Sequence, residues 1–175
     1  MRKLLCAAAL VALAGCGYQA GGLFRDDIRT VYVAGFDNKT FRRGLEVGLT
    51  RAVVDEIKLR TPLLFAPREE ADSVLSGELV AASQEASIKS ERDRILLENM
   101  SVRVRFRWRD RLTGEDIVPE QTVSESTRLP TQLTEAGVGI GGPAIAADLV
   151  RQEAAFEPVL REVAQRIVEK MQRGW

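Results

Sequence analysis

Four arginines at every second position form the densest group of side chains in the sequence that could bind an anion. They lie in residues 101–110, where they alternate with Val102, Val104, Phe106 and Trp108. A period of two is typical of a β-strand with one buried face, so the arginines share the other face, spaced roughly 7 Å apart. Guanidinium groups bind phosphate and carboxylate through paired N–H donors. The pattern predicts a face that binds an anionic ligand or partner, made of Arg103, Arg105, Arg107 and Arg109.

A solvated sheet face is the alternative interpretation of the same pattern. The arginines could pair across strands with Glu78, Glu120 or Glu125. Exposed pairs of this kind contribute only about 0–1 kcal/mol each to stability. Both interpretations place the arginines on the side of the sheet away from the core.

A thiol near the N-terminus is placed for acylation. The basic residues Arg2 and Lys3 precede an apolar stretch, Leu4 to Ala12, which is too short to span a bilayer as a helix. Leu13-Ala14-Gly15-Cys16 resembles the lipobox of bacterial lipoproteins. The resemblance implies a signal peptide at residues 1–15, an acylated Cys16 and a tether at 16–29, held in the membrane by two or three acyl chains. An ordinary secretory peptide with an incidental cysteine is the alternative.

The remaining residue types exclude most catalytic mechanisms. The chain has no histidine, so His-based triads and His metal ligands are excluded. Cys6 lies in the predicted signal peptide and Cys16 would be acylated, which leaves no free thiol, disulfide or thiolate metal site. The 25 basic and 25 acidic residues balance, so no bulk attraction to nucleic acid follows. We expect no enzymatic activity, no catalytic residue, no metal and no cofactor.

Elements on the N-terminal side of the arginines are expected to supply part of the core. Residues 30–36 are β-branched and aromatic, which predicts a strand. A helix is predicted from Phe41 to Leu59, with Asn38 or Thr40 as its cap and Pro62 after its end. A second strand is predicted from Ser73 through Ile88, and the arginine strand is expected to start near Ile95.

A hairpin and an edge strand are predicted on the C-terminal side. Gly114 suits the left-handed position of a turn at 112–115. Ile117 to Ser126 is predicted as a strand, and Pro119 places that strand at an edge. Residues 129–143 are predicted as a loop. The glycines at 137–142 lack the preceding strand and the following Lys-Ser or Lys-Thr pair of a nucleotide-binding loop.

The spacing of apolar residues in the C-terminal segment predicts a helix with one apolar stripe. Pro158 lies either in the first turn of this helix or at a kink in a longer helix that starts near Ala144. The element order is therefore β-α-β-β-β-α. We predict a single periplasmic α+β domain at residues 30–175, a two-layer sandwich with two helices on one face of a four-stranded mixed sheet. Phe106 and Trp108 should be buried beneath the helices.

Several segments, taken in order, resemble the LptE family of lipopolysaccharide-assembly lipoproteins. They are Cys16-Gly17-Tyr18, Phe36-Asp37-Asn38-Lys39-Thr40-Phe41, Leu45-Glu46, Leu49-Thr50, Arg60-Thr61-Pro62-Leu63 and Ala71-Asp72-Ser73-Val74-Leu75-Ser76-Gly77. The resemblance implies a lipid-anchored outer-membrane protein, with its domain facing the periplasm or inside a partner barrel. It implies an LptD-type β-barrel as the partner, and lipopolysaccharide as the molecule that the pair inserts. The four arginines would then contact lipopolysaccharide or an acidic lining of the barrel.

Two of these segments, residues 33–40 and 71–79, also resemble periplasmic lipoproteins of the LpoB or curli-secretion type. Proteins of that type activate a cell-wall synthase or build a secretion pore. The long meander, the glycine-rich loop and the single terminal helix favour the LptE family.

Overall fold

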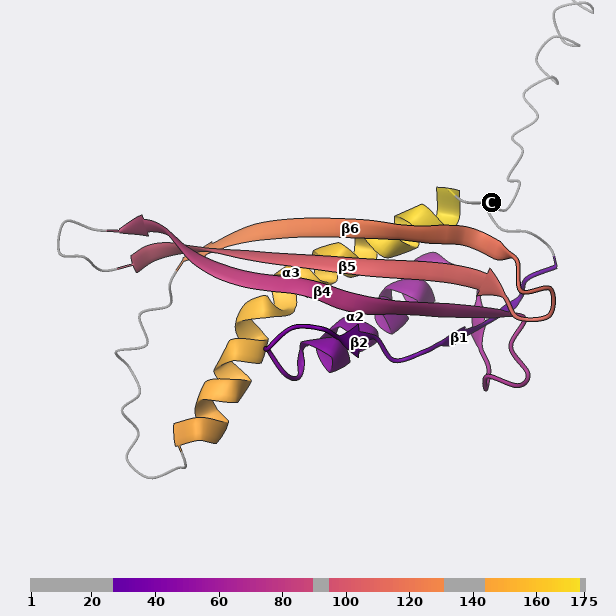
Figure 1. The fold of residues 1–175 in the computed structure, drawn as a ribbon, viewed down its shortest axis with the longest axis horizontal. Helices are drawn as coiled ribbons and strands as arrows, with labels where there is room; N and C mark the ends of the chain where they lie inside the picture. The colour runs from indigo at the N-terminus through magenta and orange to yellow at the C-terminus, as the bar shows by residue number, and fades with distance from the viewer. Residues whose placement is uncertain (1–26, 90–94, 131–143, 174–175) are drawn as a thin grey trace, which may run out of the picture.

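Three long antiparallel strands form the body of the sheet (Figure 1). β4 (Ser73–Lys89), β5 (Ile95–Asp110) and β6 (Asp116–Pro130) follow one another as a meander, with β5 in the middle. The computed structural model describes residues 27–89, 95–130 and 144–173. Cys16 and the glycines at 137–142 therefore lie outside the described residues. β6 is longer than predicted, because Leu129 and Pro130 continue its pairing with β5.

The sheet has six strands, not the four predicted. β1 (Thr30–Val33) runs parallel to β4, as expected for a strand that precedes a crossover helix. Two strands of two residues each complete the sheet: β2 (Asp37–Asn38) pairs with β4, and β3 (Leu64–Phe65) pairs with β1, both in parallel. Such short strands carry no periodicity of their own, and only the neighbouring strand edges define them. The sheet is mixed and open.

The first described helix, α2 (Leu45–Arg60), begins four residues later than predicted, and neither Asn38 nor Thr40 caps it. Gly44 occupies the cap position with a φ of 92° and without a side-chain cap bond. The Asn38 amide donates to the Arg42 carbonyl oxygen, and its Oδ1 accepts from the Thr40 N–H and hydroxyl. These bonds hold residues 38–42 as a loop. The helix ends at Arg60, since Thr61, the residue before Pro62, is extended.

The C-terminal helix, α3 (Ala144–Arg173), is the longer of the two alternatives, with Pro158 in its interior. Proline removes one backbone donor and crowds the preceding turn, which bends a helix. Figure 1 shows the helix bending, with its C-terminal half lying along the sheet and its N-terminal half leading away from it.

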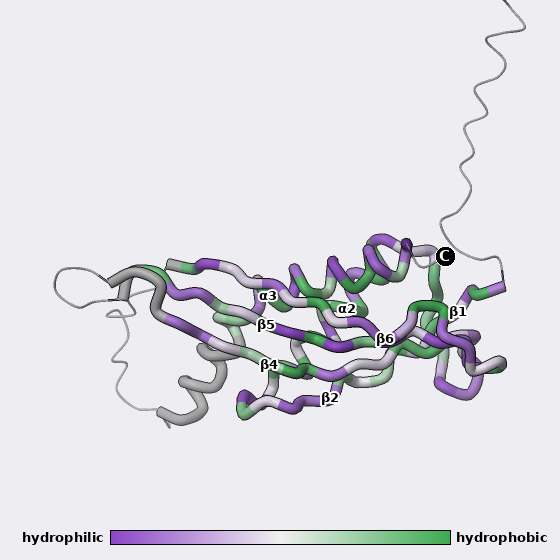
Figure 2. Tube along the Cα trace, turned by 45° about the horizontal axis from the view of Figure 1, so that its top comes forward, coloured by the Kyte–Doolittle hydropathy of each residue, from purple (hydrophilic) through white to green (hydrophobic). Residues whose placement is uncertain are grey.

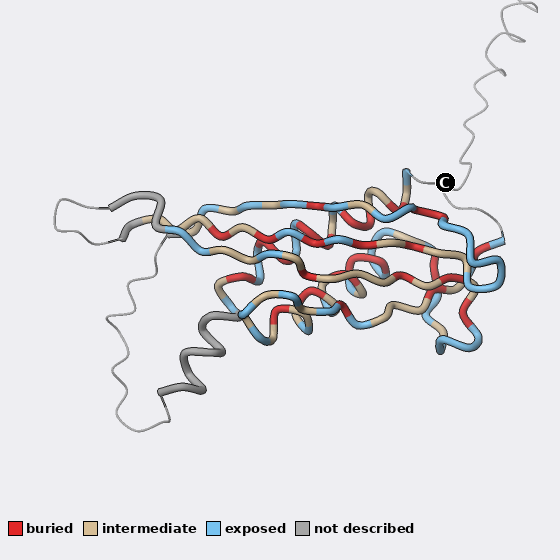
Figure 3. The backbone as a smooth tube through the Cα atoms, viewed as in Figure 1, coloured by how far each residue is buried: buried red, intermediate tan, exposed pale blue. Residues whose placement is uncertain are grey.

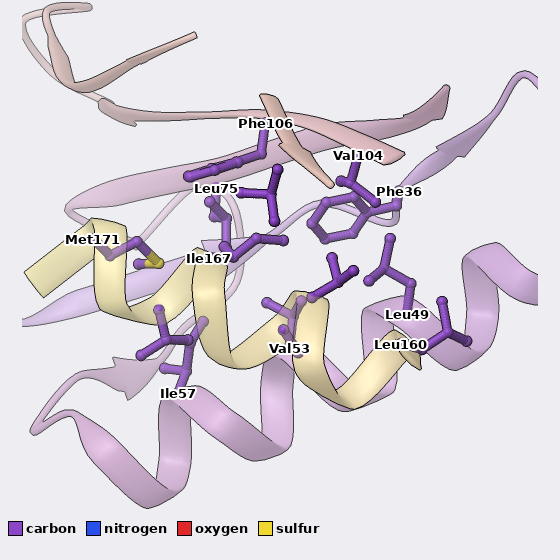
Figure 4. Close-up of a cluster of buried hydrophobic side chains, with 14 of the residues drawn as sticks. Phe36, Leu49, Val53, Ile57, Leu75, Val104, Phe106, Leu160, Ile167 and Met171 are labelled. Atoms are coloured by element: carbon purple, nitrogen blue, oxygen red, sulfur yellow. The ribbon is translucent and has the colours of Figure 1, made fainter. Parts of the chain in front are cut away.

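The core lies between the sheet and the two helices, which cover one face of it. Phe106 and Trp108 are buried as predicted, with exposed fractions of 1 % and 0 %. Leu49, Val53 and Ile57 of α2 and Ile167 and Met171 of α3 lie between the helices and the sheet residues Leu75 and Val104 (Figure 4). Leu160 of α3 packs against Gly48 of α2. Buried residues concentrate between the two layers (Figure 3).

Asp72, just before β4, joins three segments at one end of the sheet. Its Oδ2 accepts hydrogen bonds from the N–H groups of Arg29 and Thr30, at 2.9 and 2.8 Å, and from the Thr30 hydroxyl at 2.8 Å. Its carbonyl oxygen accepts from the N–H of Arg111, in the β5–β6 turn. The bonds from Arg29 and Thr30 lower the pKa of Asp72 below its usual value of 3.8.

Candidate functional site

The four arginines lie on the face of β5 that the helices leave open, and we call this surface the arginine face. β5 is the middle strand of the meander, and hydrophilic and hydrophobic residues alternate along it (Figure 2). Val102, Val104, Phe106 and Trp108 are buried on the helix side. Arg103 and Arg105 are exposed, whereas Arg107 and Arg109 are half-buried. The predicted division of the strand into an apolar and a basic face is therefore confirmed.

Three of the arginines have partners on the neighbouring strands. Arg105 forms ion pairs with Glu78 of β4 at 3.1 Å and with Glu120 of β6 at 3.9 Å. Arg109 lies 3.7 Å from Asp116, and the Nε of Arg103 donates to the Ser124 hydroxyl at 3.2 Å. Most of these side chains are substantially exposed, so the pairs orient the guanidinium groups without adding much stability.

Arg107 differs from the other three. It forms no ion pair with any residue in the described part of the chain, and its Nε is buried without a hydrogen-bond partner there. Its neighbour on β4 is Ser76, which carries no charge. A buried donor without an acceptor costs about 1–3 kcal/mol, and an anionic ligand would relieve that cost.

A change of register explains why Arg107 lacks a partner on β6. Phe106 pairs with Gln121 and Trp108 pairs with Val118, so β6 carries one more residue than β5 over this interval. An extra residue bends a strand and displaces its side chains. Pro119, a residue that suits such an irregularity, lies in this interval. The displaced Glu120 approaches Arg105 and leaves Arg107 without a carboxylate.

Glu125 does not belong to the arginine face, contrary to one of the predicted pairings. It lies opposite Val102, on the helix side, and forms an ion pair with Arg166 of α3 at 2.9 Å. Arg166 also forms an ion pair with Glu169 at 3.1 Å. The hydrogen bond and charge of Glu125, with the added charge of Glu169, raise the pKa of Arg166 above its usual value. Glu125 therefore ties the edge strand to α3.

Hydroxyl groups extend the arginine face along the strands. The Ser83 and Ser101 hydroxyls are hydrogen-bonded to one another at 2.7 Å, and Ser101 precedes Arg103 on the same face of β5. Ser124 lies on the other side of Arg103. Guanidinium and hydroxyl donors on a rigid strand suit an extended anionic ligand that bears several phosphate or carboxylate groups.

A hollow of about 640 Å³ lies between α2 and α3, and Gly48, Ala52 and Leu160 are among its lining residues. Its buried carboxylate, Glu56, forms an ion pair with Arg60. Within the described ranges, no group of three or more acidic or cysteine side chains is placed to hold a metal ion. No helix in these ranges is both long and apolar enough to cross a membrane.

Comparison with protein families gives one match over nearly the whole described chain. The family model for LptE, described as lipopolysaccharide-assembly, matches residues 28–171. The matched span begins just before β1 and ends in the last turn of α3. The sequence matches none of the curated proteins with which it was compared.

Several solved structures resemble the fold at low sequence identity. A protein from Xanthomonas campestris is 12 % identical, with 89 % of each chain covered and a TM-score of 0.55. A hypothetical protein from Chlamydia trachomatis is 13 % identical, with 82 % of this chain and 98 % of that chain covered and a TM-score of 0.50. The rare lipoprotein B from Shewanella oneidensis is 16 % identical, with 83 % of this chain and 95 % of that chain covered and a TM-score of 0.41. At these identities the first two likenesses concern the fold alone.

Proposed function

Because the chain belongs to the LptE family of lipopolysaccharide-assembly proteins, we propose that it is an outer-membrane lipoprotein that partners an LptD-type β-barrel in lipopolysaccharide transport. The observation that carries the proposal is the family match over residues 28–171, which includes both layers of the sandwich. No comparison favours the alternative of an activator or secretion-accessory lipoprotein. The chain acts by binding rather than by catalysis.

Cys16 is the point of attachment in this proposal. Acyl chains on Cys16 would hold the protein in the membrane, because each buried methylene contributes roughly 0.8 kcal/mol and two or more chains give stable anchoring. The folded domain then faces the periplasm or lies inside the partner barrel. Gly17, in place of an acidic residue after the cysteine, agrees with an outer-membrane destination.

The arginine face is the proposed contact for lipopolysaccharide or for an acidic barrel lining. Lipopolysaccharide carries phosphates and acidic sugars, the groups that arginine donors recognise. Arg107 is the first candidate among the four, because it has no ion pair among the described residues and its Nε is buried without a hydrogen-bond partner there, whereas Arg103 donates to Ser124 and the other two form ion pairs. Arg105 and Arg109 are held by carboxylates that a ligand would have to displace.

Co-purification tests the partnership. The full-length chain, with an affinity tag after Trp175, is extracted in detergent from cells of its own organism, and the captured proteins are identified by mass spectrometry. An LptD-type barrel in a one-to-one complex is the expected result. Recovery of a cell-wall synthase or a secretion pore in place of any barrel would contradict the proposal and favour the activator alternative.

A further inference from the structure

The hollow between α2 and α3 extends along the whole of α2. Its lining residues on this helix run from Gly44, at the cap, to Leu59, in the last turn. At 1.5 Å per residue this interval is about 22 Å long, which is close to the length of an extended palmitoyl chain. The volume of about 640 Å³ lies within the range of about 300–1,000 Å³ that is typical of sites for small molecules.

Features of both helices explain how the hollow forms. Small residues lie at every fourth position of α2, so this side of the helix projects little: Gly44, Gly48 and Ala52. On α3 the lining residues lie on both sides of Pro158, in the region where the helix bends (Figure 1): Ala154, Glu157, Leu160 and Arg161. A Cβ atom on Gly48 would lie 3.1 Å from Cδ1 of Leu160, so the two helices are in close contact within the hollow.

The apolar part of the lining is incompletely covered by the fold. Leu45 and Leu160 are buried members of it, whereas Val47 and Leu59 are 57 % and 77 % exposed. Apolar side chains in contact with water are a source of binding free energy for a ligand that covers them. Since all four residues line a single hollow, one apolar ligand could cover the exposed pair while resting on the buried pair.

Arg51 is a charged member of the lining without a partner. Each acidic residue of the lining is paired with a base: Asp55 with Lys58, Glu56 with Arg60 and Glu157 with Arg161. Arg51 is exposed, and its side chain forms no ion pair or hydrogen bond with another residue in the described part of the protein. A guanidinium beside an apolar surface suits a ligand whose apolar part ends in an anionic group, because paired N–H donors bind phosphate.

We propose that this hollow binds one acyl chain of a phosphate-bearing membrane lipid, whose headgroup phosphate contacts Arg51. Divided over about 22 Å, the volume of the hollow gives a mean cross-section of roughly 30 Å². This cross-section admits one extended acyl chain, whereas a helix of a partner protein, about 10–12 Å across with its side chains, would not enter. The site belongs to the helix layer, and the arginine face lies on the opposite side of the sheet. The inference therefore requires neither the barrel partnership nor the acylation of Cys16, and is compatible with both.

Photo-crosslinking of the full-length protein in its own cells tests this proposal. The photoreactive amino acid p-benzoylphenylalanine replaces Val47 in one variant and Leu59 in another, since both are exposed residues of the lining. The matched control carries it in place of Leu112, which is 76 % exposed in the β5–β6 turn and does not line the hollow. After irradiation the protein is purified through a C-terminal tag, and mass spectrometry identifies each adduct and the crosslinked peptide.

The expected result is an adduct with the mass of a phosphate-bearing lipid at positions 47 and 59 and not at position 112. The mass distinguishes a phospholipid from lipopolysaccharide, and either one supports the inference. Lipid adducts in equal yield at all three positions would show only that the protein is near a bilayer, and would overturn it. Adducts with a partner protein alone, adducts with the acylated Cys16 peptide alone, or the absence of a lipid adduct at positions 47 and 59 would overturn it as well.

Arg51→Gln, combined with the photoreactive residue at position 59, tests the contact with the headgroup. Loss of an exposed charge contact should lower the yield of the lipid adduct about two- to fivefold. Arg68→Gln is the matched control, because Arg68 is exposed in the turn after β3 and does not line the hollow. Its replacement removes the same positive charge and should leave the yield unchanged. Equal yields in the two variants would overturn the assignment of the headgroup to Arg51.

Discussion

The ring of Phe36 occupies the space that a side chain at Gly77 would need. A Cβ atom on Gly77 would lie 2.5 Å from Cε1 of Phe36 and 2.6 Å from the carbonyl oxygen of Arg105. Phe36 is 4 % exposed and joins β1 to β2 over the surface of β4. The bare backbone at Gly77 therefore allows this connection to pack closely on the sheet.

Replacing Gly77 with alanine should destabilise the fold by about 1–3 kcal/mol, because a backbone atom and a buried ring must both move. Urea unfolding measures the change. Gly35→Ala is the matched control, since a Cβ there would meet nothing within 4 Å, and it should be neutral or slightly stabilising. Equal stability of the two variants would contradict this account of the Phe36 contact.

Asp72→Asn should make stability less dependent on pH in the acidic range. The pKa of Asp72 is lowered in the folded state, so the ionised carboxylate stabilises the fold fully above its unfolded pKa of about 3.9. That contribution is lost as the pH falls through the lowered folded pKa. Wild type should exceed the variant in unfolding free energy at pH 7, and the difference should shrink near pH 2. A difference that is constant between these pH values would contradict the assignment.

The alternation along β5 was sufficient to predict both its buried face and its arginine face. Periodicity is a local property, and a central strand between two long neighbours follows it closely. β2, β3 and the late start of α2 could not be predicted in this way. Two-residue strands depend on distant edges, and the Asn38 hydrogen bonds that delay α2 form only in the folded loop.

The ion-pair and hydrogen-bond partners of the arginines were harder to predict than the face of the sheet on which the arginines lie. The register of β6 shifts near Pro119, so counting along the strand places its carboxylates incorrectly. Glu125 lies outside the shifted interval and shares the helix side with Val123 by simple alternation, whereas the shift leaves Arg107 without a partner on β6. Proline in the predicted edge strand was the available signal, although it did not reveal the direction of the shift.

Cys16→Ala should abolish acylation and leave the precursor uncleaved by the lipoprotein peptidase. The sulfur of Cys16 is the proposed acyl acceptor, and alanine offers no nucleophile in its place. Metabolic labelling with a palmitate analogue, followed by gel analysis of precursor and mature forms, measures both effects. Label that persists in the variant would show that the anchor is attached elsewhere or that the lipobox was misidentified.

Arg107→Gln should weaken lipopolysaccharide binding without weakening the fold. The variant removes a guanidinium that has no counter-charge among the described residues, so no carboxylate is left unpaired. Replacing Arg105, in contrast, would leave Glu78 and Glu120 without their cation. Arg43→Gln is the matched control. Arg43 is exposed in the loop before α2, and its replacement removes the same positive charge. Arg42 is unsuitable, since it lies 5.0 Å from the centre of the Phe156 ring and donates to Gln84.

Loss of a charge-assisted contact at a half-buried position costs about 1 kcal/mol, which corresponds to roughly a fivefold weaker affinity. Binding of purified lipopolysaccharide should therefore weaken about fivefold in Arg107→Gln, with a shallower dependence on salt, and stay at the wild-type value in Arg43→Gln. The double variant Arg105→Gln with Arg107→Gln should weaken binding further. Melting temperatures of the single variants should equal that of wild type, because the arginine face lies outside the core. If Arg107→Gln binds lipopolysaccharide normally and recovers less barrel in co-purification, the arginine face contacts the barrel lining. If it changes neither, the face is a solvated surface and the ligand site lies elsewhere.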